Sequence, residues 1–374
     1  MLSKNKSFKS IICLFTCLMI SSFKIASSQE ENKPNIYGFT SVKYAKYTNN
    51  NEPNLGDGLI DNTFSMFQSN IFVAGNVGND WKYMLELMIQ NDLTKQQEDG
   101  QNMLHQGWLE WKPADEYSVR AGRMLAPFGY FNNIHSRPNL YWFIERPFAY
   151  EEPSLTEGVS GVRFEFANLA VLGLFNLTDD IKLDYAIYGG NTSNTLGYAW
   201  DLNSKKQIGG RVALKHENIN LGFSMGNNSI YADPNDALKQ QNSNLIAIDL
   251  QANYSGFNLI AEMVNSKVTS ETRANVNSNY FIPADSSNSN ISLFATLGYD
   301  INESWVVYTA YDSFTSDALG SLYTTDTPLS RIRAGFNFKP NNSVLLKAEF
   351  NNYPYSENNR KSYNSFNLGA VLTF

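Results

Sequence analysis

Apolar and polar residues alternate along many segments of this chain, and this pattern limits the folds that it can adopt. Between positions 81 and 90 the odd positions hold Trp, Tyr, Leu, Leu and Ile, whereas the even positions include Lys82, Glu86 and Gln90. Successive side chains of a β-strand point to opposite faces, so this segment predicts a strand with one apolar and one polar face. The same pattern recurs at 246–254, 291–300 and 331–339.

The polar face of segment 331–339 carries Arg331 and Arg333, which a buried core strand would hold only beside paired partners. After residue 28, no run of residues approaches the ~18 apolar residues that a membrane-spanning helix needs, so any crossing of a membrane must use strands. A sheet with lipid on one side and water on the other accounts for both observations.

The connections between these segments alternate between short and long. Short turns are predicted near 79–80, 112–115, 217–220, 255–256, 302–303 and 340–342. Long connections are predicted at 48–62, 91–101, 125–157, 191–205, 229–242, 269–288, 314–327 and 354–362. Short turns at one rim and long loops at the other are typical of outer-membrane barrels, and a soluble sandwich has no reason to sort its loops in this way.

Counting the alternating segments predicts about sixteen strands, with an uncertainty of two. The fold class is therefore all-β: a transmembrane, antiparallel, up-and-down β-barrel. The sixth strand is predicted at 158–167, and the apolar stretch 168–180 is interpreted as either an extension of that strand or a short turn helix. A barrel of this size encloses an aqueous channel, whereas ~8 strands would leave an interior filled by side chains.

The first 28 residues have the features of a cleaved export leader. Lys4, Lys6 and Lys9 give a basic start, 11–20 is a short apolar run, and small residues precede Gln29. We therefore expect a signal peptide at 1–28 and a single barrel domain at 29–374. Both cysteines of the chain, at positions 13 and 17, lie inside the predicted leader, so the processed chain has neither a disulfide nor a cysteine metal site.

The last strand alternates up to the terminal residue and resembles the signal that bacterial barrel-assembly machinery recognises. Asn367, Gly369, Leu372 and Phe374 carry this resemblance, and an ordinary last strand of a soluble sheet is the alternative. The expected location is the outer membrane of a Gram-negative bacterium, where lipid and lipopolysaccharide would surround the barrel.

Charge and histidine content argue against other function classes. Removal of the predicted leader removes four lysines, so the net charge falls from −7 to 25 minus 36, or −11. This net negative charge argues against nucleic-acid binding.

The only histidines are His105, His135 and His216, and none lies at metal-ligand spacing from a second histidine or cysteine. His135 and Ser136 are the one pair suggestive of a hydrolase, and adjacent residues rarely share a site. We predict no enzymatic activity, no metal and no cofactor.

The third long connection, 125–157, is rich in aromatic and charged residues. It includes the run Tyr141-Trp142-Phe143, and so many large apolar groups must be buried. Folding into the barrel mouth would bury them, and packing against a neighbouring subunit is the alternative. The candidate constriction residues on this loop are His135, Arg137, Glu145, Arg146, Glu151 and Glu152.

Three segments resemble the central part of the phosphate-selective porin O and P family. They are 120–129 (RAGRMLAPFG), 158–166 with Gly161, and 185–191 (YAIYGGN). The resemblance implies a homotrimer of sixteen-stranded barrels that passes anions, with the third loop folded inward and cations along the route. This chain departs from the family because its third loop mixes Arg137 and Arg146 with Glu145, Glu151, Glu152 and Glu157, so phosphate specificity does not follow.

Alternation places charges of both signs on the lumen face, among them Lys43, Lys347, Glu86, Glu262 and Glu349. The candidate basic wall opposite the acidic third loop consists of Arg120, Arg163, Arg211, Arg331 and Arg333. Rings of like charge set selectivity in pores, whereas cross-strand pairing of these charges would only stiffen the wall. Both interpretations remain open at this stage.

The leading hypothesis is a porin for passive diffusion of small hydrophilic solutes or ions, with anions such as phosphate among them. An alternative is a barrel whose long loops at 229–242 and 269–288 bind a surface partner. A barrel lipase or protease is the least favoured hypothesis. The sequence identifies neither the solute nor the sign of selectivity.

Overall fold

The computed structural model describes residues 33–47, 63–91, 101–114, 116–150, 166–191, 206–231, 240–270, 287–316, 329–354 and 362–374. Within these residues there are sixteen strands and two short 3₁₀ helices, η3 (Phe131–Asn133) and η4 (Phe148–Tyr150). The strands are β1 (Asn35–Tyr47), β2 (Thr63–Val77), β3 (Trp81–Asn91), β4 (Gln101–Trp111), β5 (Ser118–Leu125), β6 (Phe166–Asn176), β7 (Lys182–Asn191), β8 (Lys206–His216), β9 (Ile219–Tyr231), β10 (Gln240–Tyr254), β11 (Phe257–Ser270), β12 (Ser287–Asp300), β13 (Trp305–Ser316), β14 (Leu329–Asn341), β15 (Val344–Tyr353) and β16 (Tyr363–Thr373).

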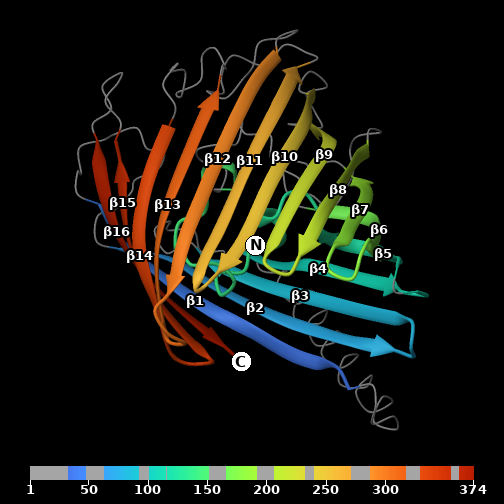
Figure 1. The fold of residues 1–374 in the computed structure, drawn as a ribbon, viewed down its shortest axis with the longest axis horizontal. Helices are drawn as coiled ribbons and strands as arrows, with labels where there is room; N and C mark the ends of the chain where they lie inside the picture. Colours follow the sequence, from blue (N-terminus) through green and yellow to red (C-terminus); the bar gives the residue numbers. More distant parts are fainter. Residues whose placement is uncertain are drawn as a thin grey trace, which may run out of the picture.

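The sixteen strands form one closed antiparallel barrel in which each strand pairs with its neighbours in sequence (Figure 1). The barrel closes where β1 pairs with β16, in a register that sets Phe39 opposite Thr373. The backbones of Gly38 and Phe374 continue this ladder with N–H···O=C distances of 2.9 and 3.1 Å. Closure leaves no free sheet edge, as a strand structure in a bilayer requires. The predicted fold class and the count of sixteen strands are confirmed.

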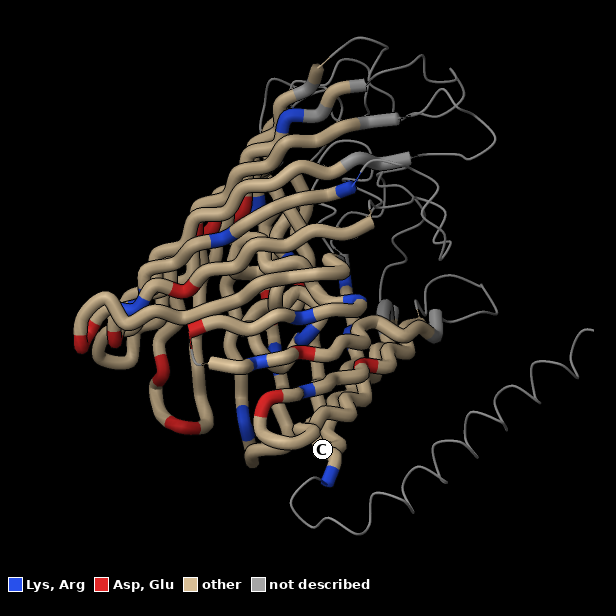
Figure 2. Tube along the Cα trace, turned by 90° about the vertical axis from the view of Figure 1, so that its right-hand side faces the viewer, with Lys and Arg blue, Asp and Glu red and all other residues tan. Residues whose placement is uncertain are grey.

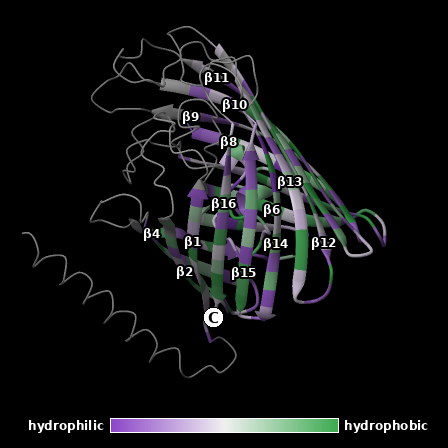
Figure 3. Ribbon diagram, turned by 90° about the vertical axis from the view of Figure 1, so that its left-hand side faces the viewer, coloured by the Kyte–Doolittle hydropathy of each residue, from purple (hydrophilic) through white to green (hydrophobic). Residues whose placement is uncertain are grey.

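The two faces of the barrel wall differ as the alternation predicts. Large apolar side chains on the outer face are exposed, such as Ile187 and Ile208, each 61% exposed, whereas Glu86, Asp249 and Arg331 on the inner face are at most 1% exposed. Hydrophobic and hydrophilic residues accordingly alternate along individual strands in Figure 3. Within the described ranges, no helix has the length and apolar character of a membrane span.

The rim with the short turns is marked by aromatic and acidic residues. Aromatic side chains pair across strands beside the turns, for example Trp81 with Trp111 at 6.4 Å and Phe257 with Tyr299 at 4.7 Å between ring centroids. Such aromatic girdles lie at the membrane interface of outer-membrane barrels. Figure 2 shows acidic residues on several of these turns, which carry Asp80, Glu116, Asp179, Asp180, Glu217 and Glu303.

The sixth strand lies mostly outside its predicted range of 158–167. β6 occupies 166–176, the segment that the sequence left as either extended strand or turn helix, and it pairs with β5 and β7. Its alternation is obscured because both of its faces are apolar: Leu169 and Val171 face outward, whereas Ala170 and Leu172 pack on apolar residues inside the barrel. The β5–β6 connection is consequently longer than the predicted 125–157.

Several predictions fall on residues that the structure does not describe. The leader at 1–28 is among them, as are Glu151, Glu152, Glu157 and Arg163 of the long β5–β6 connection. These remain predictions from sequence.

The position of β6 can be tested with a lysine on its outer face. We expect Val171→Lys to destabilise the folded barrel by ~2–4 kcal/mol, the cost of a lysine near the centre of the lipid-facing belt. Leu177→Lys is the control, because Leu177 lies in the exposed bend after β6. Urea unfolding in lipid vesicles measures both, and equal effects would contradict this placement of β6.

Candidate constriction site

The segment that follows β5 turns into the barrel and contacts the inner wall. Residues 126–150 carry both 3₁₀ helices and hydrogen bond to side chains of β2, β9, β11, β14 and β15. We call residues 126–150 the inward loop. It contacts strands that are far apart around the barrel.

An aromatic cluster forms the core of the inward loop. The ring of Phe131 lies 5.3 Å from Tyr141, 5.4 Å from Phe143 and 5.1 Å from Tyr150, measured between centroids. The wall completes the cluster with Phe294, 5.6 Å from Phe131, and with smaller apolar side chains of β10 and β11. These aromatic loop residues, for which the sequence predicts burial, are therefore buried against an apolar patch of the lumen wall.

Glu262 on β11 holds the start of the inward loop. Its carboxylate accepts the backbone N–H groups of Tyr130 at 2.7 Å and Phe131 at 3.0 Å, together with the hydroxyl of Tyr150. Gly129 has a φ of +59°, and a Cβ at this position would lie 2.7 Å from the Glu262 carboxylate. Glycine thus allows both the left-handed turn and the close approach of the loop to its anchor.

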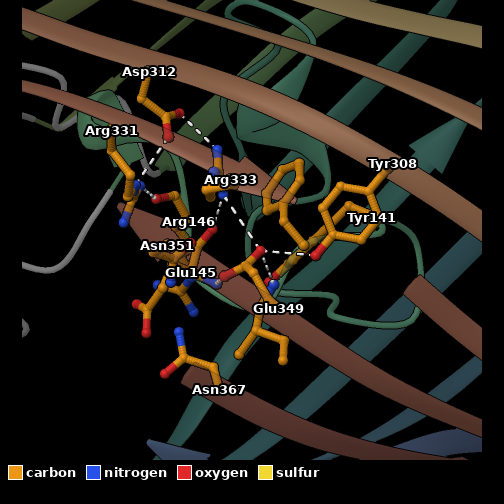
Figure 4. Close-up of polar contacts among 12 residues, drawn as sticks. Tyr141, Glu145, Arg146, Tyr308, Asp312, Arg331, Arg333, Glu349, Asn351 and Asn367 are labelled. Atoms are coloured by element: carbon orange, nitrogen blue, oxygen red, sulfur yellow. Dashed lines mark hydrogen bonds and ion pairs between the residues drawn. The ribbon is translucent and has the colours of Figure 1, made fainter. Parts of the chain in front are cut away.

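Lys347 and Glu349 on β15 hold the middle of the inward loop. Figure 4 shows Glu349 beside Tyr308. The Lys347 ammonium donates to three backbone carbonyls, those of Pro138 at 2.6 Å, Tyr141 at 2.5 Å and Phe143 at 3.1 Å. The Glu349 carboxylate accepts the N–H groups of Ile144 at 3.0 Å and Glu145 at 3.2 Å, and the Tyr308 hydroxyl at 2.8 Å. In this part of the loop, Lys347 therefore satisfies backbone acceptors and Glu349 satisfies backbone donors.

Arg331 and Arg333 on β14 hold the end of the inward loop (Figure 4). They donate to the carbonyls of Arg146 and Glu145, both at 2.5 Å. Asp312 on β13 bridges the two guanidinium groups at 3.0 and 2.6 Å. These three side chains are fully buried, so the two arginines of the predicted basic wall lie beneath the loop.

A fourth contact is made by the opposite part of the wall. Glu86 on β3 accepts from Asn70 and Gln106, each at 2.5 Å, and lies 3.9 Å from the guanidinium of Arg137 on the loop. Gln68 on β2 donates to the carbonyl of Ser136 at 2.9 Å. Strands on both sides of the barrel therefore hold the loop.

Glu145 and His135 are among the loop groups whose pKa values are shifted. Burial alone would raise the pKa of Glu145, but Lys43, 2.5 Å away, together with Arg331 and Arg333 lowers it below its usual range. Burial, with a contribution from Arg146, lowers the pKa of His135 to about 3. His135 is therefore neutral at ordinary pH, with Nδ1 2.8 Å from the carbonyl oxygen of Asn132.

The other described members of the basic wall are paired with carboxylates. Arg120 donates to Glu110 on the adjacent strand at 2.6 and 2.9 Å, and its guanidinium carbon lies 4.0 Å from the centroid of the Trp108 ring. Arg211 on β8 reaches Asp249 on β10 at 2.8 Å across β9. This bridge requires Gly222 between them, because a Cβ there would lie 2.3 Å from both partners.

The structure brings Glu145, Arg146, Arg331 and Arg333 together, whereas Arg120 and Arg211 lie in separate pairs. The sequence placed Lys43, Glu86, Glu262, Lys347 and Glu349 on the lumen face but did not identify them as loop anchors. Asp312 and Tyr150 were not identified at all. Within the described ranges, no group of three or more His, Cys, Asp or Glu side chains is arranged to hold a metal ion.

Comparison with known proteins places these features in context. The family model for phosphate-selective porin O and P matches residues 47–272. No curated protein sequence matches the chain.

Three solved barrels illustrate the likeness in fold. Salmonella typhi OmpF, solved with daunomycin, is 14% identical with a TM-score of 0.61, covering 92% of this chain and 98% of its own. An anion-selective porin from Comamonas acidovorans is 12% identical with a TM-score of 0.60, covering 92% and 100%. A trimer form of Vibrio cholerae OmpT is 11% identical with a TM-score of 0.55, covering 92% and 100%.

Removing the Lys347 ammonium, which donates to three loop carbonyls, should loosen the inward loop. We expect Lys347→Met to leave loop carbonyls without a donor and to lower the free energy of unfolding by on the order of 2–4 kcal/mol. Urea unfolding of the folded barrel measures this change, and Lys339→Met, which alters an exposed lysine of β14, is the control. Equal stability of the two variants would contradict the anchoring role.

Proposed function

This chain belongs to the phosphate-selective porin O and P family, and we propose that small hydrophilic solutes or ions cross its barrel by passive diffusion. As a member of this family with a sixteen-stranded barrel, it is a channel of the Gram-negative outer membrane. The solutes and the selectivity are the part that we propose.

The observation that carries the proposal is the inward loop, held inside a closed barrel by polar side chains from both sides of the wall. Sixteen strands enclose a lumen wide enough for water. A fixed loop across that lumen limits the size of the solute. Passive diffusion of this kind needs no cofactor and no energy source.

The charges inside the barrel support weak selectivity. Arg120, Arg211, Arg331 and Arg333 each have a carboxylate partner in the wall, and the loop contributes cations and anions side by side. Unopposed rings of one sign select ions, whereas mixed walls discriminate weakly. Anions, phosphate among them, are therefore proposed as solutes without a dedicated phosphate site in the described part of the lumen.

We propose that the barrel forms a homotrimer. One structurally similar barrel, the Vibrio cholerae OmpT described above, was solved in a trimer form.

We also propose that Asn367, Gly369, Leu372 and Phe374 serve as the signal for the barrel-assembly machinery. The backbone of Phe374 pairs with β1 and its side chain is 62% exposed, which is consistent with that role. Lipid and lipopolysaccharide would contact the apolar outer face.

The alternative functions have less support. A barrel hydrolase would need a reactive histidine, but His135 is buried and has its Nδ1 beside the Asn132 carbonyl. The partner-binding hypothesis concerns 229–242 and 269–288, most of whose residues lie outside the described ranges. It therefore stays a hypothesis from sequence.

Conductance of the purified barrel in planar bilayers tests the proposal. We expect ohmic channels whose reversal potential under a tenfold salt gradient is less than half of the ~59 mV of an ideally selective pore, with little block by added phosphate. Heat-unfolded protein is the control. A folded barrel that conducts no current would refute the channel, and a near-ideal reversal potential would refute weak selectivity.

A further inference from the structure

A band of apolar side chains interrupts the polar inner face of the barrel wall. Its members point inward from adjoining strands and contact one another: Tyr37 and Phe39 on β1, Phe72 on β2, Met84 on β3 and Trp108 on β4. We call these five residues the apolar band. Leu345 on β15 and Val371 on β16 continue the cluster across the closure of the barrel. The lumen wall therefore offers apolar contacts as well as charges.

Part of the apolar band is accessible from the lumen. Phe39 and Phe72 are buried, whereas the ring of Tyr37 is 40% exposed. This ring stacks on Phe72 with 4.9 Å between centroids and 9° between the ring planes. Trp108 is half-buried. A solute inside the barrel can thus reach an aromatic face that buried neighbours hold in place.

Arg137 of the inward loop lies over the apolar band. Its guanidinium carbon is 4.9 Å from the centroid of the Phe72 ring, and its side chain is 26% exposed. Glu86 is its one ion-pair partner within the described ranges, at 3.9 Å, which is too long for a hydrogen bond. The oxygens of Glu86 already accept from Asn70 and Gln106 at 2.5 Å each. The guanidinium group of Arg137 donates no hydrogen bond to any described residue, and its Nε is buried without a partner there.

This freedom distinguishes Arg137 from the arginines of the candidate basic wall. The four that the structure describes each donate to a carboxylate: Arg120 to Glu110, Arg211 to Asp249, and Arg331 and Arg333 to Asp312. Such hydrogen bonds occupy donors that an anion in the lumen would otherwise use. Arg137 keeps its donors for an acceptor that enters the lumen.

The free guanidinium group and the aromatic face together fit an organic anion with an aromatic body. Tight recognition of phosphate takes several charge-assisted hydrogen bonds, but one guanidinium group with free donors lies here. A carboxylate matches the planar fork of a single guanidinium, and a ring attached to it would cover apolar surface of the band. A cation carrying the same ring would meet Arg137 as a like charge.

We propose that Arg137 and the apolar band form a binding site for aromatic carboxylates that pass through the lumen. This inference rests on the proposed channel function and names one class of its solutes. The ring of the solute stacks against Tyr37, and its carboxylate accepts from the guanidinium group of Arg137. The site lies where the inward loop meets the wall. Binding of moderate strength at such a site favours entry and still permits release.

Block of the current by three small probes tests the site. The barrel is reconstituted into planar bilayers in KCl at neutral pH, and benzoate, acetate or benzamide is added. Acetate has the carboxylate without the ring, and benzamide has the ring without the charge. We expect benzoate to halve the current at a concentration at least tenfold lower than either of the other probes. Equal half-blocking concentrations of benzoate and acetate would overturn the proposal.

Two variants test the two parts of the site separately. We expect Arg137→Gln to weaken the benzoate block at least severalfold relative to Lys339→Gln, which removes the same charge from an exposed lysine of β14. Tyr37→Ser should weaken the benzoate block severalfold and leave the effect of acetate unchanged. A benzoate block in Arg137→Gln equal to that of the lysine variant would overturn the role of Arg137, and an unchanged block in Tyr37→Ser would overturn the role of the ring.

Binding measured without current separates this inference from the proposed function. Saturation-transfer NMR on the folded barrel in detergent reports benzoate and acetate binding directly. A non-conducting barrel that binds benzoate in preference to acetate would refute the channel and keep the site. A conducting barrel that shows no such preference would refute the site alone.

Discussion

The hydrogen bonds between charged side chains of the lumen wall and the backbone of the inward loop are the interactions on which the rest of the structure depends. A loop folded into a barrel takes its peptide groups away from bulk water, and each group then needs a partner. Glu262 and Glu349 accept loop N–H groups, whereas Lys347, Arg331 and Arg333 donate to loop carbonyls. The aromatic cluster supplies apolar burial, and these bonds determine where the loop lies.

Anchoring has a consequence for ion selectivity. A cation that is buried, paired with a carboxylate and bonded to a carbonyl is not free to attract a passing anion, and Arg331 and Arg333 meet all three conditions. These two arginines, which would look like part of a selective ladder in a list of lumen residues, therefore hold the inward loop in place. The weak selectivity that we propose follows from this arrangement rather than from a shortage of charge.

Much of the architecture could be predicted from sequence because each strand of the barrel wall has one face toward lipid and one toward the lumen. Apolar and polar residues therefore alternate along most strands. The exception, β6, packs apolar side chains both outward and against the inward loop, so its two faces look alike. The lumen side of Lys347 and Glu349 was predictable from alternation. Their loop partners were not, because those contacts join residues about 200 positions apart and depend on the path of the loop.

Hydrogen exchange at the loop amides that donate to the wall tests the central claim most directly. If Glu262 and Glu349 hold the inward loop, the backbone amides of Tyr130, Phe131, Ile144 and Glu145 should exchange as slowly as amides in the barrel strands. Mass spectrometry of the intact, reconstituted barrel would measure this. Exchange of these four amides as fast as in an unstructured peptide would contradict the account.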